Sequence, residues 1–593
     1  MNDRPSIVSD FACWGAAAAF LLGLVVLAVN LYAVQIEDTA EMRYAAQEQS
    51  VRRIRLAPPR GRILERNGIV LAGNRPCFSI VCHCEYFSRR GWEASAEAIV
   101  EAERELALAT GLVPSLTVSN VVHYLVNEVS VPLTVWDDVD RFAFERFCEH
   151  SRMFPGFSVV EREEREYPYG TLASHVLGFT GSSDAGDPSV EGRFYFRQKE
   201  MTGRAGLEYF YDDYLHGVPG VELLTVDSRC FTVTRETVVR AERGPDLELT
   251  LDAKIQRAAE RELADRRGAC VVIDPRDGGI LAAVSAPAYD LRLMVPRLSP
   301  EMNSAYFGNR DYRNRFSGET YAPGSTFKPV TALAALAVGA SAVAPYECIG
   351  EFRLGEWRLR CSRRWGHGPE TMRTALRDSC NPYFCALGND IGTNALIRAA
   401  KAFGLGASTG VDLPGEVGGV VPDGAWKTRV YGENWYPGDL PQMSIGQGML
   451  TATPLQMACV AAALATGRRV RPHFKKTISD SVDRGALPFT AAQLRVVREG
   501  MTAVVNDPLG SGVKGGEGVV DANGRRVTVA GKTGTAEVGV GERRRKNTWF
   551  IAYAPVEAPE VAVALVVEDG ESGGSTAAPK VAAVLREAMG GRR

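Results

Sequence analysis

The chain begins with one long apolar stretch that carries no charge. Phe11 to Ile36 is uncharged and rich in Ala, Leu and Val, and a stretch of this length can cross a bilayer as a helix. It is longer than the apolar region of a cleaved signal peptide, and no basic start precedes it. We therefore predict a single-pass transmembrane anchor at residues 11–36, behind a short cytoplasmic tail at residues 1–10.

The charges that flank this stretch argue against the orientation that we expect. Arg4 is the one basic residue before it, whereas four arginines follow it closely, namely Arg43, Arg52, Arg53 and Arg55. A simple count of positive charges would keep the long part of the chain inside the cell. Large domains, however, cross the membrane largely regardless of such charges. We therefore predict that the bulk of the chain lies on the outer side of the cytoplasmic membrane.

Residues 37–245 mix strand-like and helix-like patterns and hold no catalytic signal. Asn67-Gly68, with an apolar run beyond it, predicts a hairpin, and Phe78 to Val81 predicts a strand. Glu93 to Leu106 has the pattern of a charged amphipathic helix, and a second helix is expected from Gly206 to about Leu215. We predict a mixed pedestal domain that serves as a binding surface or a spacer.

From residue 246 to residue 593, strand patterns stand at both ends and helical patterns lie between them. Asp252 should cap a helix over Ala253 to Arg266. The other expected elements are strands at Ala269 to Ile273, Ile280 to Ser285, Val527 to Ala530, Thr548 to Ala554 and Val561 to Val567, and a helix at Ala578 to Met589. Strands from both ends predict an α+β domain in which an antiparallel sheet packs on a helical part. The site would lie in the crevice between the sheet edge and the helices.

Composition narrows the class of protein without naming a function. A chain of 593 residues is too long for one core, so several domains are expected. With 45% hydrophobic residues, 23% charged residues and a net charge of −3, it gives no reason to expect nucleic acid as a partner. The charge run Arg543 to Lys546 is expected to be a solvated hairpin loop. His175, far from any catalytic element, is expected to be structural.

The candidate chemistry centres on Ser325 and Lys328, which precede an apolar helical run from Val330 to Val338. Residues three apart share a helix face, so the Ser325 hydroxyl and the Lys328 amine can meet if a helix begins near Ser325. A hydroxyl becomes a nucleophile when a neighbour takes its proton, and a lysine can do so when it is desolvated or lies beside another cation. At a helix N-terminus, Ser325 also offers its backbone N–H to a developing oxyanion.

This spacing alone is weak evidence, because Ser511-Gly512-Val513-Lys514 has it too. That second pair lies in a Gly-rich stretch with no apolar helix behind it, and we expect a loop there. Two further motifs distinguish Ser325. Ser379-Cys380-Asn381 follows the helical run Thr371 to Asp378, and Lys532-Thr533-Gly534-Thr535 closes the strand-like run Arg526 to Gly531. A nucleophile helix, a polar loop and a strand edge that carries a cation, in this order, form the signature of the serine enzymes that penicillin acylates.

On these motifs, the chain resembles the class B penicillin-binding proteins, which are membrane-anchored peptidoglycan transpeptidases with a β-lactamase-like catalytic domain. The likeness covers nearly the whole chain and includes Arg60-Gly61, Arg165 to Gly178 and Gly206-Leu207-Glu208 in the pedestal. It is most similar to the elongation type, through the segments Trp365 to Gly368, Asn434 to Asp439, Ser444 to Gly448 and Thr451 to Gln456. The resemblance implies cross-linking of stem peptides during cell-wall elongation and cell-shape maintenance, on the outer side of the membrane.

The resemblance also implies catalytic roles. Ser325 is the nucleophile and Lys328 its base, Ser379 and Asn381 relay protons and hold the peptide amide of the substrate, and Lys532 adds positive potential. Which lysine carries which proton is left open, because the two amines titrate as a coupled pair.

Substrate binding is implied in the same way. The hydroxyls of Thr533 and Thr535, on either side of Gly534, bind the terminal carboxylate of a D-alanyl-D-alanine donor. The N–H groups of Ser325 and Thr535 form the oxyanion hole. β-Lactams mimic the donor and leave an acyl group on Ser325, and the chemistry requires no cofactor.

Twelve cysteines are many for an exported chain of this kind, and three of them form a group with a histidine. Cys348, Cys361, His367 and Cys380 have the spacing Cys-x12-Cys-x5-His-x12-Cys, and three thiols with one imidazole suit tetrahedral zinc. Some elongation-type relatives resemble this chain in having a metal-binding set in the same region. A structural zinc would brace the catalytic loop. The alternative is a disulfide between Cys348 and Cys361 across the hairpin Glu351 to Arg360, and both readings stay open.

Other functions fit parts of the pattern. A division-type transpeptidase shares the motifs, and a D,D-carboxypeptidase or a β-lactamase would use the same acyl-enzyme, although no base for a deacylating water is evident. A non-enzymatic β-lactam sensor or scaffold is opposed by the intact catalytic residues. Elongation-type relatives work with a polytopic membrane glycosyltransferase, contacted through anchor and pedestal, and the resemblance implies the same partner here.

Overall fold

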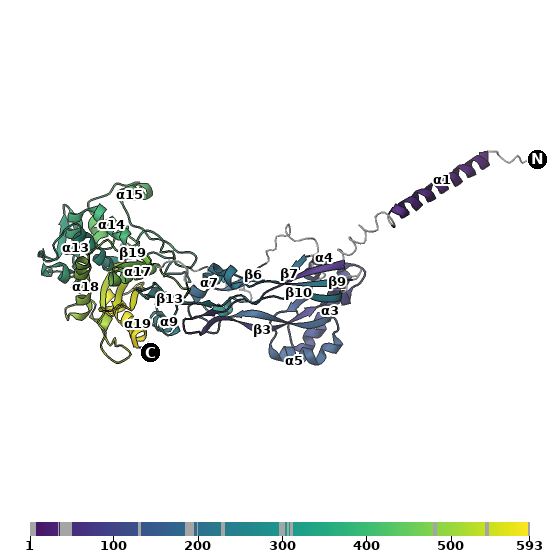
Figure 1. Ribbon diagram of the computed structural model, residues 1–593, viewed down its shortest axis with the longest axis horizontal. Helices are drawn as coiled ribbons and strands as arrows, with labels where there is room; N and C mark the ends of the chain where they lie inside the picture. Colours follow the sequence, from purple (N-terminus) through teal and green to yellow (C-terminus); the bar gives the residue numbers. More distant parts are fainter. Residues whose placement is uncertain are drawn as a thin grey trace, which may run out of the picture.

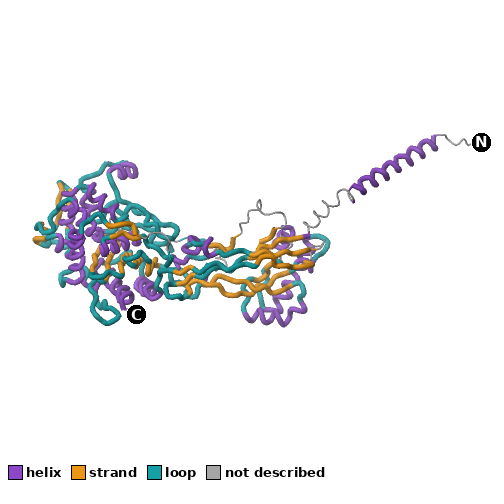
Figure 2. Tube along the Cα trace, in the orientation of Figure 1, coloured by secondary structure: helices purple, strands orange, loops and turns teal. Residues whose placement is uncertain are grey.

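The computed structural model describes residues 8–33, 35, 50–127, 132–183, 195–197, 200–226, 232–295, 303–304, 308, 312–477, 483–539 and 545–590. The molecule is elongated, and a strand-rich pedestal lies between the first helix and a larger C-terminal domain (Figure 1). Strands run along the pedestal, whereas the C-terminal domain contains most of the helices (Figure 2).

The first helix, α1 (Val8–Tyr32), stands apart from the folded body in Figure 1. Its segment Phe11–Tyr32 is long and apolar enough to cross a membrane, and its side chains are exposed. Within the described ranges, it is the one helix that meets this test. The helix agrees with the predicted anchor, although Ile36, the predicted end, lies outside the described residues.

Two larger sheets and one strand pair, β6 (Thr180–Ser183) with β8 (Glu200–Gly203), build the described part of the pedestal. One sheet has the strand order β10-β9-β1-β7, and the other has the order β11-β2-β3-β4 with β5 paired to β3. Their strands are β1 (Val51–Leu56), β2 (Ile63–Leu64), β3 (Val70–Cys82), β4 (Leu133–Trp136), β5 (Phe157–Glu166), β7 (Tyr195–Arg197), β9 (Gly220–Val226), β10 (Thr232–Val239) and β11 (Leu247–Glu248). The predicted hairpin is confirmed, because β2 and β3 are antiparallel and Gly68 between them has φ +88°.

Helices cover the end of the pedestal that lies farther from the C-terminal domain. These helices are α3 (Trp92–Thr110), α4 (Val118–Asn127) and α5 (Arg141–His150), and they share a core with the Cys82 end of β3. The helix predicted from Gly206 to Leu215 is wrong in one respect. It is two short helices, α7 (Gly206–Phe210) and α8 (Asp212–Leu215), because Tyr211 leaves the helical conformation.

A buried ionic network joins distant pedestal segments. Arg60 and Arg165 donate to the two carboxylate oxygens of Glu208, each at 2.6 Å, and Arg60 also binds Asp212 at 2.6 Å. Glu208 is fully buried, so its charge depends on these two guanidinium groups. The network connects the approach to β2, the end of β5 and helix α7.

The C-terminal domain is built on a five-stranded antiparallel sheet of order β13-β12-β22-β21-β20. Its strands are β12 (Gly268–Ile273), β13 (Ile280–Ala286), β20 (Ala530–Val538), β21 (Arg545–Ala554) and β22 (Val561–Val567). The prediction of a sheet made from both ends of the domain is therefore confirmed.

Both faces of this sheet are buried by helices. Along β12, Cys270 and Val272 pack with α9 (Ala253–Leu263) and α19 (Ala578–Gly590), whereas Val271 and Ile273 belong to the core on the other face. That second face is covered by α17 (Pro454–Thr466), which is buried almost throughout. Alternate side chains of the strand thus serve two cores, as a period of two requires.

The remaining helices lie between the two ends of the sheet in the sequence. They are α11 (Lys328–Ala337), α12 (Met372–Arg377), α13 (Asn381–Ile391), α14 (Thr393–Ala402), α15 (Gly424–Tyr431), α16 (Asp439–Ser444) and α18 (Ala491–Asn506). Small strand pairs accompany them, namely β14 (Tyr346–Cys348) with β17 (Gly368–Glu370), β15 (Glu351–Leu354) with β16 (Trp357–Arg360), and β18 (Arg468–Val470) with β19 (Asp483–Ala486).

Two predictions near the last strands are wrong. The strand expected at Val527 to Ala530 lies instead at Ala530–Val538, so the Lys532-Thr533-Gly534 motif is inside a strand. Arg545 and Lys546 belong to β21 and not to a loop, while Arg543 lies outside the described residues.

Candidate active site

The candidate site lies where a 3-10 turn, η5 (Gly324–Phe327), meets the edge strand β20. Gly324 has φ +56°, and a Cβ there would lie 3.0 Å from the carbonyl oxygen of Thr535. A glycine is therefore needed for the turn to approach the strand this closely. The turn runs directly into α11 with Pro329 in its first helical turn, so Ser325 lies at the predicted helix start.

Lys328 is fully buried and is held by the segment that follows α12. Its Nζ donates to Ser379 O and to Asn381 Oδ1, both at 2.7 Å, and lies 3.3 Å from Ser379 Oγ. Among the described residues, these contacts replace the hydrogen bond to Ser325 that the spacing allows. The ring of Phe384, which the sequence did not point to, lies 5.5 Å from this amine.

Lys532 reaches the same serine from the sheet. Its Nζ donates to Ser379 Oγ at 2.9 Å and to Thr533 O at 3.1 Å. Ser379 has φ +56°, a backbone conformation that residues other than glycine seldom adopt. Because of this conformation, the Ser379 hydroxyl lies between two buried amines that come from a helix and from a strand.

Burial sets the electrostatics of this pair. It lowers the pKa of Lys328 to about 8. Burial, together with the nearby charge of Lys328, holds the pKa of Lys532 well below the usual lysine value. Two amines that share one hydroxyl cannot both hold a charge at low cost, so the pair gives up a proton near neutral pH. A base for a serine nucleophile needs this property.

Thr533 and Thr535 lie two residues apart on β20, so their side chains share one face of the strand. Gly534 between them cannot be replaced without displacing the nucleophile turn, because a Cβ there would lie 2.9 Å from Thr326 Cγ2 and 3.0 Å from Pro323 O. The strand that carries the two hydroxyls therefore packs directly against the turn that carries Ser325.

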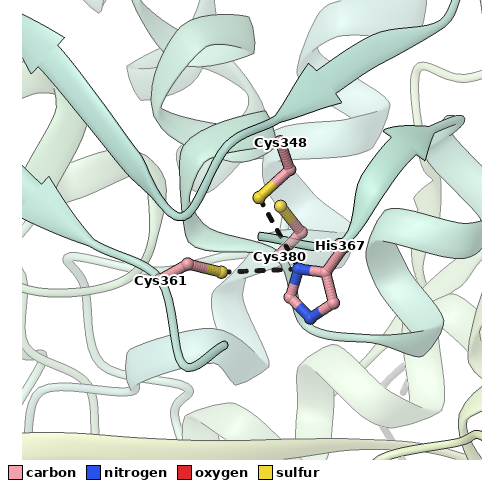
Figure 3. A group of neighbouring side chains, drawn as sticks. All are labelled: Cys348, Cys361, His367 and Cys380. Atoms are coloured by element: carbon pink, nitrogen blue, oxygen red, sulfur yellow. Dashed lines mark hydrogen bonds between the residues drawn. The ribbon is translucent and has the colours of Figure 1, made fainter. Parts of the chain in front are cut away.

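A cysteine and histidine cluster lies beside the catalytic segment (Figure 3). The side chains of Cys348, Cys361, His367 and Cys380 converge, and their ligand atoms all lie within 4.8 Å of one another. His367 Nδ1 is 3.7 Å from Cys348 Sγ and 3.5 Å from Cys361 Sγ. Both cysteines are free thiols, so the disulfide that was the alternative is not formed. Cys380 connects the cluster covalently to Ser379.

Glu370 extends this cluster and was missed in the sequence. Its Oε1 lies 3.9 Å from His367 Nδ1, and in the described part of the chain neither carboxylate oxygen has a hydrogen-bond partner. Burial raises its pKa to about 7. A glutamate three residues after a glycine-flanked histidine gave no signal in the sequence, because the contact depends on the pairing of β14 with β17.

Two candidates have the non-catalytic roles that the sequence predicted for them. His175 is buried, donates from Nε2 to Tyr312 O at 3.0 Å, and burial lowers its pKa to about 4, as expected of a structural histidine. Ser511 and Lys514 form no second nucleophile pair, because the segment is a turn with a 3-10 helix at Val513–Gly516 and Lys514 is exposed. Ser511 nevertheless reaches the site, which the sequence did not indicate.

Comparison with known proteins agrees with this geometry. The family model "Penicillin binding protein transpeptidase domain" matches residues 268–588, and the model "Penicillin-binding Protein dimerisation domain" matches residues 55–249. The peptidoglycan D,D-transpeptidase MrdA of Acinetobacter baumannii is 32% identical over 95% of this chain and 85% of its own length.

Solved structures give the same result. The PBP2 chain from a complex with MreC from Helicobacter pylori aligns with a TM-score of 0.75 at 27% identity, over 90% of this chain and 98% of that chain. A structure described as the coordination of polymerization and crosslinking by a peptidoglycan synthase complex aligns with a TM-score of 0.72 at 28% identity, over 98% and 99%.

Proposed function

Since this chain belongs to the penicillin-binding protein transpeptidase family, we propose that it is a peptidoglycan D,D-transpeptidase that cross-links stem peptides through an acyl-enzyme on Ser325. We assign this activity to cell-wall elongation, and the similarity to relatives named MrdA and PBP2 supports this role. The observation that carries the proposal is the Ser379 hydroxyl held between two buried lysine amines, beside the turn that bears Ser325.

Acylation begins when the Ser325 oxygen attacks the carbonyl carbon between the two terminal D-alanines of the donor. The serine proton passes to the neutral amine of Lys328, which burial keeps poised near neutral pH. The oxyanion lies between the N–H groups of Ser325 and Thr535, where the loss of one donor costs about 3 to 4 kcal/mol in comparable enzymes. The C–N bond then breaks, and the leaving amine takes a proton through Ser379.

Transfer completes the cycle. An amine of a neighbouring stem peptide attacks the ester carbon, loses a proton to the lysine pair, and the Ser325 oxygen leaves and regains its proton. The side-chain oxygen of Asn381 accepts from Lys328 Nζ at 2.7 Å and its Nδ2 donates to Arg360 O at 3.4 Å, and the second N–H of this side chain would hold the peptide amide of the donor. The hydroxyls of Thr533 and Thr535 bind the terminal carboxylate of the donor, supported by the positive potential of the lysine pair. A β-lactam undergoes the acylation step in the same way, but its acyl group stays attached to Ser325.

The cluster of Cys348, Cys361, His367 and Cys380 fits a structural zinc. Bonds of about 2.3 Å to sulfur and 2.0 Å to nitrogen place tetrahedral ligand atoms about 3.5 to 3.8 Å apart. The two sulfur-to-nitrogen distances of 3.7 and 3.5 Å agree with these values. The buried carboxylate of Glu370, which has no hydrogen-bond partner in the described part of the chain and lies 3.9 Å from His367 Nδ1, also suits a cation. Bound zinc would brace the hairpin and Cys380, and no step of the reaction runs through it.

We propose the domain division 1–10, 11–36, 37–245 and 246–593 for tail, anchor, pedestal and transpeptidase domain. The apolar segment Phe11–Tyr32 supports the anchor, and the family matches at residues 55–249 and 268–588 support two domains after it. The match to residue 249 and the pairing of β11 with β2 favour a pedestal that ends a few residues beyond 245. The anchor is embedded in the cytoplasmic membrane, with residues 1–10 in the cytoplasm and residues 37–593 on the outer side. A polytopic glycosyltransferase is the proposed partner, supported by the aligned synthase complex, whose description names polymerization together with crosslinking.

Product analysis tests the proposed reaction. The full chain, in detergent, is given a donor peptide that ends in D-alanyl-D-alanine and an amine-bearing acceptor peptide. We expect release of D-alanine in equal amount with a cross-linked product, and neither product with Ser325→Ala. Release of D-alanine with only the hydrolysed donor would favour a D,D-carboxypeptidase instead.

A further inference from the structure

The turn between α18 and β20 brings Ser511 to the threonine hydroxyls of the proposed carboxylate site. Ser511 Oγ lies 3.0 Å from Thr533 Oγ1 and 2.9 Å from Arg377 O, and the backbone N–H of Ser511 donates to the same Arg377 carbonyl at 3.2 Å. Gly510 and Gly512 fix the turn, through N–H bonds to Asp507 O at 2.8 Å and to Val504 O at 3.0 Å. The position of the Ser511 hydroxyl is therefore defined by backbone.

Thr535, the other hydroxyl of this face, shows what a carboxylate site needs. The N–H of Gly573 donates to Thr535 Oγ1 at 3.2 Å, so this oxygen already accepts a hydrogen bond from the protein. A hydroxyl has one proton and can donate it to a ligand while its oxygen accepts elsewhere. Thr535 can therefore donate to a carboxylate without giving up its protein contact.

Thr533 Oγ1 accepts a long contact from Lys532 Nζ at 3.5 Å, but the direction of its own proton depends on Ser511, the closer neighbour at 3.0 Å. If the Ser511 hydroxyl donates to Arg377 O, the Ser511 oxygen accepts a hydrogen bond from the Thr533 hydroxyl. Thr533 then has no proton left to donate to a ligand. If Ser511 turns its proton toward Thr533, the Thr533 proton is released, while the Ser511 N–H still satisfies the Arg377 carbonyl. Both arrangements use the same heavy-atom positions, so the change needs only the rotation of two hydroxyl groups.

We propose that Ser511 is a positioning residue for donor binding, which turns the Thr533 hydroxyl toward the terminal carboxylate of the substrate or of a β-lactam. This inference rests on the proposed function. Ser511 touches neither the substrate nor the reacting atoms, and acts by donating to Thr533. The Arg377 carbonyl, two residues before Ser379, ties the same turn to the catalytic segment, while the Arg377 side chain is fixed by Asp378 at 2.7 Å and Asp507 at 3.1 Å.

The test is a double-mutant cycle on Ser511 and Thr533. Second-order acylation rate constants with benzylpenicillin are measured for the wild type, Ser511→Ala, Thr533→Val and the double variant, all as the full chain in detergent. We expect Ser511→Ala to slow acylation about five- to tenfold, the size of a lost hydrogen bond between two uncharged groups. In the Thr533→Val background, we expect Ser511→Ala to change the rate less than about twofold, because the residue through which it acts is gone.

Two further variants guard the interpretation. Ser511→Thr keeps a hydroxyl and should restore most of the rate. Lys514→Ala removes the exposed lysine that lies three residues after Ser511, and it should leave the acylation rate unchanged. Wild-type rates with Ser511→Ala, or an equal loss in both backgrounds, would overturn the relay and leave the proposed function intact. A wild type that benzylpenicillin does not acylate at all would overturn the proposed function itself.

Discussion

Two buried lysine side chains meet at the hydroxyl of Ser379, and this contact could be only partly predicted. The residue types and their order along the chain predicted a serine nucleophile, a base and a cation. The sequence paired Lys328 with Ser325, whereas its amine is held by Ser379 O and Asn381 Oδ1 at 2.7 Å. That contact depends on the left-handed backbone of Ser379 at φ +56°, which the packing of the surrounding segments imposes.

The rate of acylation should depend on pH through the lysine pair. A base must be neutral to accept the serine proton, and burial lowers the pKa of Lys328 to about 8. The neutral fraction rises as the pH rises through this value, so we expect the rate constant with a penicillin to increase from pH 6 to pH 9 with a midpoint near 8. Stopped-flow measurement checks this, with circular dichroism at each pH as the control for folding. A profile that is flat across this range would contradict the assignment of Lys328.

At the scale of elements, the strand β20 shows why the sheet was predicted better than the site. Val527 and Val529 have strand propensity, but the carbonyl of Val529 accepts from Asn506 Nδ2 at 2.9 Å and does not pair in the sheet. The true strand contains Gly531 and Gly534, which weaken any strand pattern. The glycines are needed because a Cβ at Gly531 would lie 2.7 Å from the ring of Phe550, and one at Gly534 would meet the nucleophile turn. Strand propensity describes single residues, so it does not predict where the backbone must approach neighbouring groups this closely.

The hairpin β15–β16 and the catalytic segment should lose stability together when the cysteine cluster is broken. Cys361→Ser removes one of three thiols, so we expect native mass spectrometry to find one zinc on the wild type and none on the variant, with a lower melting temperature. Cys148→Ser, at an exposed cysteine of α5, is the matched control and should keep the metal and the melting temperature. Equal metal content in wild type and Cys361→Ser would contradict the zinc site.

At the scale of the whole molecule, the hydrophobic pattern predicted an anchor, a pedestal and a sheet drawn from both ends of the last domain. It could not predict how the pedestal is joined, because Arg60, Arg165 and Glu208 are far apart in the sequence. Charged residues in a sequence are normally expected at the protein surface, and only the burial of these three in the structure shows that they join pedestal segments. This junction connects the approach to β2, the end of β5 and helix α7 within the pedestal.

Removing one cation from this junction should destabilise the pedestal strongly. Arg165→Ala leaves a fully buried Glu208 with a single guanidinium partner, and breaking a buried pair typically costs about 3 to 5 kcal/mol of the free energy of unfolding. Arg141→Ala breaks an exposed pair with Glu145 and is the matched control, expected to leave the unfolding midpoint unchanged. Urea denaturation compares the two variants. Equal midpoints would show that the junction does not stabilise the pedestal.

Intact-mass analysis after treatment with benzylpenicillin tests the central claim most directly. Full-length wild type, Ser325→Ala and Ser511→Ala are each incubated with the drug and weighed. We predict a single adduct with the mass of the drug on the wild type and on Ser511→Ala, and none on Ser325→Ala. An adduct that persists on a folded Ser325→Ala variant, or no adduct on the folded wild type, would contradict the account of Ser325 as the nucleophile.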